Sequence, residues 1–181
     1  MDAWRNMVVS PRSFKYKLVD ACEMPFADAN FDLVIANHML YAVSDTAKAI
    51  REIHRILKPG GTLLAATNGT RHMLELAPYV SMLDPNASQD PENIFYKQLA
   101  FTLENAAEQL EPVFSSVARL EYEDSLEIDE VEPVLEYLLS GFELDKIKIG
   151  SLAAVKAALL LELKNKSILK VNKNSGCFIC S

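Results

Sequence analysis

The order of apolar and polar residues predicts a strand, a helix and a second strand in the first half of the chain. Residues 31–37, FDLVIAN, contain a continuous apolar run with β-branched members, which is typical of a strand covered on both faces. Ser44 and Asp45 can cap a helix over residues 46–57, whose apolar side chains recur at helical spacing. A Pro-Gly-Gly sequence ends that helix, and the apolar segment 62–68 follows as a strand. Together these elements predict a β-α-β unit with parallel strands.

The rest of the chain has further periodic segments. Alternation over residues 14–21, FKYKLVDA, predicts a strand that leads into a loop over 22–30. The later segments predict a short helix at 72–82, a helix at 103–114 capped by Thr102, a strand at 117–128, and helices at 130–140 and 152–164, the second capped by Ser151. At the end of the chain, SILKV and GCFIC, joined by residues 172–175, predict a terminal hairpin or two short strands. We find no repeat and no linker, so the expectation is one domain over residues 1–181.

Composition and charge narrow the class of protein. The chain has 181 residues, of which 50% are hydrophobic, and its formal net charge is −7. This is the profile of a folded globular protein without the basic surface that nucleic-acid binding needs, so no nucleic-acid partner is expected. The sequence contains no membrane-spanning apolar run and no signal peptide, so we expect a cytoplasmic protein without a membrane partner. An acidic segment, 121–136, and a lysine-rich one, 146–173, predict two solvated faces.

A pair of cysteines near the end of the chain raises the question of a metal site. Cys177 and Cys180 have Cys-x-x-Cys spacing, but they lie in an apparent strand, where positions three apart point to opposite faces. The sequence has no second pair and no histidine nearby. We therefore predict no metal and interpret the two residues as small side chains that pack in a terminal strand.

One block of the sequence resembles a known family. Residues 20–69 read DACEMPFADANFDLVIANHMLYAVSDTAKAIREIHRILKPGGTLLAATNG. Asp-Ala, a Pro-Phe loop, Phe-Asp before a strand, and a helix ending in Leu-Lys-Pro-Gly-Gly before another strand occur in this order in class I S-adenosylmethionine-dependent methyltransferases, including those of the ubiquinone/menaquinone type. The resemblance implies an α/β fold: an incomplete Rossmann-like sheet holding strands 3 to 7 of the family order 3-2-1-4-5-7-6, with flanking helices. Strands 3, 4, 5 and 6 would be FKYKLV, FDLVIA, TLLAAT and VARLEYED, and strand 7 would be antiparallel.

The resemblance also implies which parts of the chain meet the cofactor, S-adenosyl-L-methionine. Residues 1–69 would form the cofactor side, 70–101 a cover over the substrate, and 102–181 the C-terminal strands and helices. Asp20 and Ala21 match the positions that contact adenine; a simple turn cap at the end of a strand is the alternative for Asp20. Phe26 matches a position near adenine, and core packing explains it equally well.

Three further residues are candidates for contact with the reacting groups. Asn37 and His38 match positions beside the methionine part of the cofactor, and Tyr41 follows on the substrate side. His38 and Tyr41 are also the candidate catalytic residues, although an exposed histidine without a proton-transfer role is as consistent with the sequence. Methyl transfer requires mainly alignment and exclusion of water, so strong catalytic motifs are not expected. The implied acceptor is a small molecule.

The sequence has no Gly-x-Gly-x-Gly segment, although the family uses one to approach the cofactor. Its first glycine is Gly60, and we expect a chain truncated before the family's strand 3. Residues 31–37 would then form a sheet edge, and we expect strand 3 to pair with it, two chains to form a homodimer through it, or another polypeptide to supply the missing half. The alternative to an active enzyme is an impaired fragment with a binding or regulatory role, or without function; another nucleotide-binding α/β protein is disfavoured because no phosphate-binding loop is present.

Overall fold

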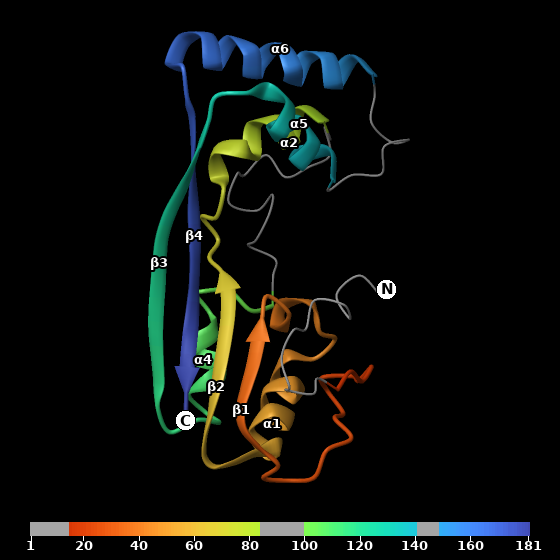
Figure 1. Ribbon diagram of the computed structural model, residues 1–181, viewed down its shortest axis with the longest axis vertical. Coiled ribbons are helices and arrows are strands. Elements are labelled where there is room, and N and C mark those ends of the chain that lie inside the picture. The colour runs from red at the N-terminus through yellow and green to blue at the C-terminus, as the bar shows by residue number, and fades with distance from the viewer. Residues whose placement is uncertain (1–14, 84–99, 141–148) are drawn as a thin grey trace.

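The computed structural model describes residues 15–83, 100–140 and 149–181, and these form a four-stranded sheet with helices packed around it (Figure 1). The strands are ordered β1-β2-β4-β3. Strand β1 spans Phe31–Asn37 and β2 spans Leu57–Asn68, and they pair in parallel. Both predicted strands of the β-α-β unit are confirmed, and β2 begins five residues earlier than the predicted start at residue 62 because its first residues continue past a register shift between Phe31 and Leu33.

Helix α1, Thr46–Ile56, connects these two strands as predicted. Its N-terminal residue is capped by Asp45, whose carboxylate accepts the Lys48 backbone N–H at 2.9 Å. A short 3-10 helix, η2 (Leu40–Ala42), lies between β1 and α1. The helix ends at Ile56, and Gly60 has a left-handed φ of 76° in the segment that follows.

The second half of the sheet is a long antiparallel ribbon. Strand β3, Val117–Ile128, has the predicted bounds, and it pairs along its whole length with β4, Leu169–Cys180. The predicted terminal hairpin is wrong: β4 is one continuous strand, because residues 172–175 pair with β3 instead of turning. Strand β4 also pairs antiparallel with β2, so the strand order and directions match strands 4-5-7-6 of the class I order.

The remaining helices follow the predicted pattern with changed bounds. They are η3 (Leu74–Leu76), α2 (Ala77–Leu83), α4 (Ala106–Leu110), α5 (Val131–Ser140) and α6 (Ile149–Lys166). Helix α4 is shorter than predicted because Phe101 and Leu103 insert into the core and Asn105 accepts the Thr102 N–H at 2.7 Å, which holds a turn before the helix. Ser151 lies inside α6 and is not its cap.

The predicted strand at 14–21 is wrong for residues 15–19, which have no regular structure. No described strand lies alongside them, and Leu18 is fully exposed. A strand needs a neighbour to satisfy its backbone hydrogen bonds, and alternation alone does not supply one. The expected pairing of this segment with residues 31–37 does not occur, because β1 pairs only with β2 among the described strands.

Two hydrophobic cores lie along the ribbon. The lower one packs α1, α4 and the 101–114 segment against β1, β2 and the end of β4, around side chains such as Ile50, Leu63, Phe101 and Phe178. The upper one joins α2, α5 and α6 to the far ends of β3 and β4, around Val155, Leu159 and Val171. In Figure 1 the ribbon of β3 and β4 connects the two groups of helices.

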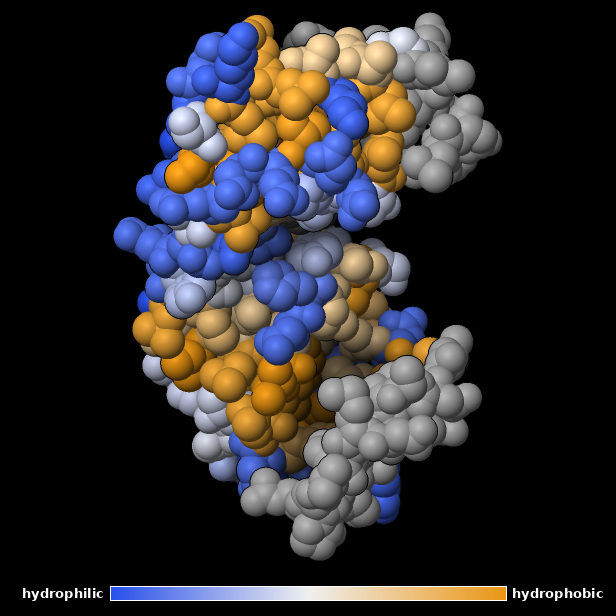
Figure 2. Space-filling model, turned by 45° about the horizontal axis from the view of Figure 1, so that its top comes forward, coloured by the Kyte–Doolittle hydropathy of each residue, from blue (hydrophilic) through white to orange (hydrophobic). Residues whose placement is uncertain are grey.

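The lower sheet is covered on one face only by the described residues. Alternate side chains of the paired strands point to opposite faces of the sheet. One set packs against α1 and α4, and the other set points to the opposite face. The outward row contains Leu33, Ile35, Leu120 and Tyr122, which are 47%, 57%, 56% and 66% exposed. We call these four residues, with Leu64 and Ile179 between them, the open face; Figure 2 shows apolar surface on the lower half of the molecule.

Candidate functional site

The carboxyl ends of the parallel strands β1 and β2 meet at one edge of the sheet, where an open α/β sheet binds its ligands. Asn37 is the last residue of β1; it lies opposite Ala66 and is exposed. His38 follows with a left-handed φ of 49°, and its backbone N–H donates to the Ala66 carbonyl at 2.9 Å. The chain therefore turns away sharply at this point, and both predicted residues stand at the carboxyl edge.

A polar cluster beside this edge is formed by residues that the sequence did not single out. The Ser175 hydroxyl donates to Asn68 Oδ1 at 2.7 Å and lies 3.2 Å from His72 Nδ1. The Asn174 backbone N–H also contacts His72 Nδ1, at 3.1 Å. The cluster depends on β4 crossing next to the end of β2, which places residues about a hundred positions apart side by side. Their separation along the chain gave no signal before the strand order was known.

His72 is the buried ionisable group of this cluster. Burial is the main cause that lowers its pKa, a backbone hydrogen bond with Asn174 opposes the shift, and the positive charges of His38 and Lys173 lower it further.

Asp20 and Ala21 lie in a tight turn before α1. Asp20 Oδ1 accepts the Cys22 N–H at 2.8 Å. The carboxylate therefore caps a turn, which was the alternative to adenine contact for this residue. Asp20 also lines an open pocket of about 380 Å³, together with Leu18, Val19, Glu23, Met24 and Pro25. Asn37 does not line that pocket, and Ala21 packs at the border of the lower core.

The turn that contains Asp20 contacts the start of α1. The neighbouring Cys22 thiol donates to the carbonyl of Asp45, the residue that caps the start of α1. The Met24 wall of the pocket instead contacts Glu52 and Arg55, nearer the end of that helix. Asp20 and Asn37 make no contact with each other among the described interactions.

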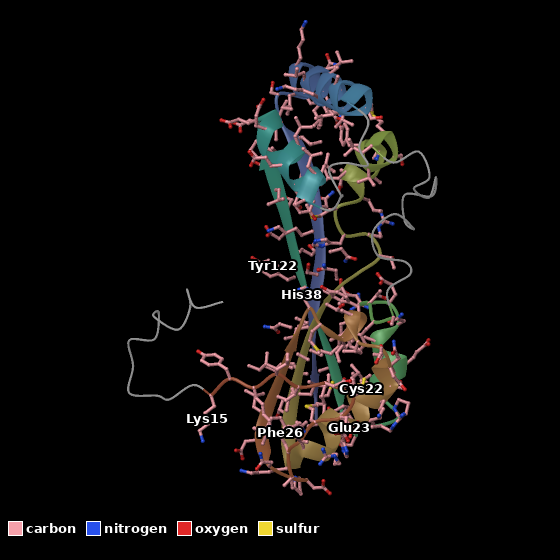
Figure 3. The ribbon with its side chains drawn as sticks, turned by 90° about the vertical axis from the view of Figure 1, so that its right-hand side faces the viewer. Lys15, Cys22, Glu23, Phe26, His38 and Tyr122 are labelled. Atoms are coloured by element: carbon pink, nitrogen blue, oxygen red, sulfur yellow. The ribbon has the colours of Figure 1, made fainter. Side chains whose placement is uncertain are left out.

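Phe26 lies elsewhere. Its ring packs edge-on against Phe31, with centroids 5.0 Å apart, and Lys17 Nζ lies 5.4 Å from its centroid. Phe31 is the first residue of β1, so Phe26 is near the amino end of the strand and away from Asn37, and Figure 3 shows Phe26 well separated from His38. Tyr41 is half-buried in η2 and packs against the lower core.

Neither the cysteines nor the helices suggest another kind of site. Cys177 and Cys180 are free thiols in β4, and burial raises the pKa of Cys180 to about 11. Within the described ranges, no three His, Cys, Asp or Glu side chains are grouped so that they could hold a metal ion. No helix of these ranges is long and apolar enough to cross a membrane.

Comparison with known sequences identifies the central block. A family model described as a methyltransferase domain matches residues 1–65. The chain is 41% identical over 63 residues to the ubiquinone/menaquinone biosynthesis C-methyltransferase UbiE of Haemophilus ducreyi, covering 35% of this chain and 24% of the relative. It is 36% identical over 69 residues to malonyl-[acyl-carrier protein] O-methyltransferase 1 of Coxiella burnetii, covering 38% and 24%. These matches agree with the strand order of the sheet.

The matched part of the chain is a methyltransferase domain, and the sheet has the strand order of the class I S-adenosylmethionine-dependent methyltransferases. The chain spans about a quarter of the length of these two curated relatives. Solved structures agree on the fold of this methyltransferase chain: a candidate methyltransferase of Anabaena variabilis has a TM-score of 0.57 at 13% identity and covers 96% of this chain and 75% of its own. A second candidate methyltransferase, from Bacillus halodurans, has a TM-score of 0.55 at 14% identity, with 92% and 76% covered.

Proposed function

We propose that this methyltransferase chain binds S-adenosyl-L-methionine across the carboxyl ends of β1 and β2 and takes part in methyl transfer to a small molecule in the cytoplasm. The observation that supports the proposal is the parallel β1–β2 edge inside the class I strand order, with the family's central block folded around it. A ligand at this edge would lie between Asn37 and the polar cluster of Asn68, His72 and Ser175.

The chain's own residues would bind and align the reactants. Asp20, at the pocket that contains Met24, is proposed to accept a hydrogen bond from the adenine amine, and the adjacent backbone to hold a ring nitrogen. Asn37 and His38 would hold the methionine part. When bound, the cofactor supplies an electrophilic methyl group, so the protein has to direct the acceptor along the methyl–sulfur axis and exclude water. His38 and Tyr41 are the side chains proposed to take a proton from an acceptor that carries one.

Calorimetric titration with S-adenosylhomocysteine tests the proposal. We expect micromolar binding by the full chain and a loss of about tenfold or more in Asp20→Ser, because a charged hydrogen bond contributes about 1.5–3 kcal/mol. Serine still caps a turn, so the variant separates the carboxylate's contact with ligand from its local role. Asp32→Ser is the matched control: Asp32 is an exposed aspartate of β1 whose side chain pairs with Lys58.

Absence of binding by the unmodified chain at millimolar ligand would contradict the enzyme proposal. It would favour the alternative, a methyltransferase-derived polypeptide with a binding or regulatory role. The observation that favours this alternative is the open face, which offers an apolar surface without requiring a cofactor. Equal affinity of Asp20→Ser and the unmodified chain would reject the proposed role of Asp20 alone.

For the partner, we propose a homodimer through the outer edge of β1. In the described sheet β1 has a neighbour on one side only, and Leu33 and Ile35 are exposed on the open face next to this edge. An unpaired apolar edge favours pairing with another strand. We expect Ile35→Lys to shift the mass measured by light scattering toward the monomer. Leu120→Lys is matched in exposure, 56% against 57%, but lies on β3, so its dimer should persist; a monomeric unmodified chain would reject the dimer.

A further inference from the structure

The loop between Asp20 and β1 is held in place by one helix. Residues 21–30 contain no helix or strand, and this loop makes few backbone hydrogen bonds within itself. Such a segment would be mobile unless other groups fixed it. Helix α1 supplies these groups from its last two turns, through Glu52 and Arg55.

All three side-chain nitrogens of Arg55 donate hydrogen bonds to this loop or to Glu52. Nη1 donates to the Phe26 carbonyl at 2.8 Å and to Asp28 Oδ1 at 2.7 Å, and Nη2 donates to the Met24 carbonyl at 3.0 Å. Nε and Nη2 also donate to the two carboxylate oxygens of Glu52, at 2.9 and 2.8 Å. A guanidinium has five N–H groups, so each of them can serve one of these five contacts. No other side chain offers as many donors in the same planar geometry.

Glu52 completes the arrangement from the other side. Besides its two bonds from Arg55, it accepts the Met24 backbone N–H at 3.0 Å. Both backbone groups of Met24 are therefore bound, the N–H by Glu52 and the carbonyl by Arg55. Met24 lines the pocket that contains Asp20, so the pair fixes one wall of that pocket directly.

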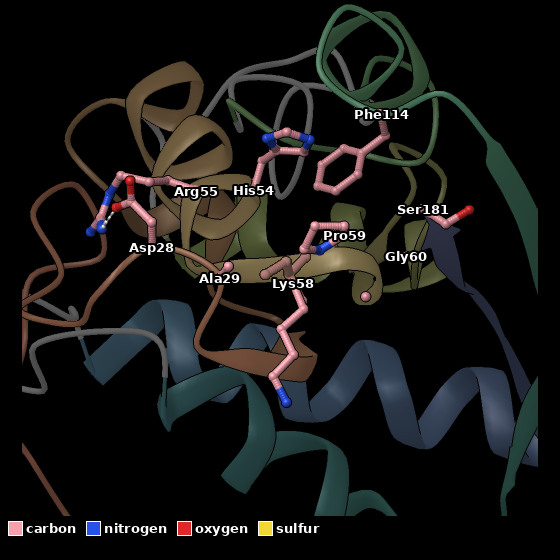
Figure 4. A pocket seen from close by; sticks show the side chains of 11 residues that line it. Asp28, Ala29, His54, Arg55, Lys58, Pro59, Gly60, Phe114 and Ser181 are labelled. Carbon is pink, nitrogen blue, oxygen red and sulfur yellow. Dashed lines mark hydrogen bonds and ion pairs between the residues drawn. The ribbon is translucent and has the colours of Figure 1, made fainter.

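The distal part of the loop is attached to the same helix. The Ala29 N–H donates to the Arg55 carbonyl at 3.0 Å, and the Asn30 N–H donates to the Ile56 carbonyl at 2.8 Å. These bonds satisfy carbonyls at the end of α1 that have no partner within the helix. Figure 4 shows Arg55 beside Asp28 at this end of the molecule. The loop is thus bound at Met24, Phe26 and its last two residues.

Charge reinforces this geometry. The hydrogen bonds from Arg55, followed by that from Met24, lower the pKa of Glu52 to about 2, so the carboxylate stays ionised at neutral pH. The Glu52 and Arg55 side chains are 20% and 32% exposed, so the pair is partly shielded from water. A fork-shaped pair of two parallel hydrogen bonds is more specific in direction than a single ion pair.

We propose that Glu52 and Arg55 are positioning residues that hold the loop wall of the Asp20 pocket in the shape that receives the adenine ring. This inference rests on the proposed function, since the ligand is the cofactor proposed for that pocket. Neither residue lines the pocket; both act through the backbone of Met24 and Phe26. A preformed wall avoids the cost of ordering the loop when the ligand binds.

The test combines backbone hydrogen exchange, which needs no ligand, with titration by S-adenosylhomocysteine. In Arg55→Lys we expect amides of residues 22–30 to exchange about tenfold faster or more, while those of β2 keep their protection, because lysine cannot make the five contacts. Affinity for the ligand should fall by about tenfold. Arg51→Lys, the same substitution at an exposed position of α1, should change neither quantity.

Each outcome decides the inference. Unchanged exchange of residues 22–30 in Arg55→Lys would show that Arg55 does not hold the loop. Faster exchange with unchanged affinity would show that Arg55 holds the loop but does not position it for the ligand. If the unmodified chain does not bind the ligand, the proposed function fails, and with it the adenine role, whereas the exchange result still decides whether the loop is held by Arg55. Glu52→Gln keeps the side-chain shape and loses the charge, so it carries the same two measurements if Arg55→Lys does not fold.

Discussion

Gly176 lies where β4 packs against both β3 and Leu103 of the lower core, and replacing it by alanine is a direct test of the fold. It pairs with Glu121 across β3 and β4 and with Thr67 across β2 and β4. A Cβ at this position would lie 2.5 Å from the Leu120 carbonyl oxygen and 3.0 Å from Leu103 Cδ2. The first atom belongs to the backbone of the neighbouring strand, so the ribbon itself has to move.

The expected destabilisation follows from these distances. Overpacking of a filled site costs about 1–3 kcal/mol. Alanine also restricts the unfolded chain and regains about 0.4–1 kcal/mol, since among the described glycines only Gly60 has a positive φ and the backbone of Gly176 is open to other residues. The net loss in free energy of unfolding should be about 1–2 kcal/mol, which corresponds to roughly 2–8 °C in Tm for a chain of this size.

Urea denaturation followed by circular dichroism measures this loss for Gly176→Ala. Cys177→Ala is the control: it is the next residue of β4, points to the open face and should change stability by less than about 1 kcal/mol. A midpoint for Gly176→Ala equal to or above that of the unmodified protein would refute the packing of segment 101–105 against β4.

Three other predictions concern local groups. Asp45→Ala removes the acceptor of the Lys48 N–H and should lower stability by about 1 kcal/mol in the same assay, more than Ser44→Ala does. The pKa of Glu52 is lowered from 4.5 to about 2, so the stabilisation of the folded protein by ionised Glu52 is fully present above pH 4.5. Protection of the loop amides from hydrogen exchange should therefore persist to about pH 4 and be lost as the pH falls toward 2. Burial raises the pKa of Cys180 to about 11, so at pH 8 this thiol should react far more slowly with a disulfide reagent in the folded than in the unfolded protein.

Contrary results would identify the faulty step. Equal stabilities of the two cap variants would mean that the Asp45 side chain does not cap α1 in solution. Loss of loop protection near pH 5 would show that Glu52 is not paired as described. Rapid modification of Cys180 in the folded protein would show that the end of β4 is open to solvent.

The sequence predicted elements whose signals are local. Residues 31–37 and 117–128 were assigned as strands with the bounds that the structure has, and the capped helix after Asp45 was found, because an apolar run, alternation and a capping residue are all visible within a few positions. The order of strands 4, 5, 7 and 6 came from the family resemblance and is confirmed by the sheet, whereas strand 3 does not form at residues 15–19.

The errors arose where distant parts of the chain decide the structure. Residues 172–175 have the composition of a turn, yet they form the middle of β4 because β3 pairs with them. Residues 15–19 alternate like a strand and form none, since no strand lies next to them. The same holds for the site: Asn37 and His38 were found in a local motif, whereas His72 and Ser175 meet only through the crossing of β4. The pairing of Glu52 and Arg55 with the loop was equally invisible, because helix surfaces often carry such charges.

The polar middle of β4 has a consequence for ligand binding. Asn172 to Ser175 form a polar stretch of β4 between the two apolar cores, and the carboxyl end of β2 lies beside it. A ligand at that end would therefore meet hydrogen-bonding groups of β4 instead of the apolar side chains of either core.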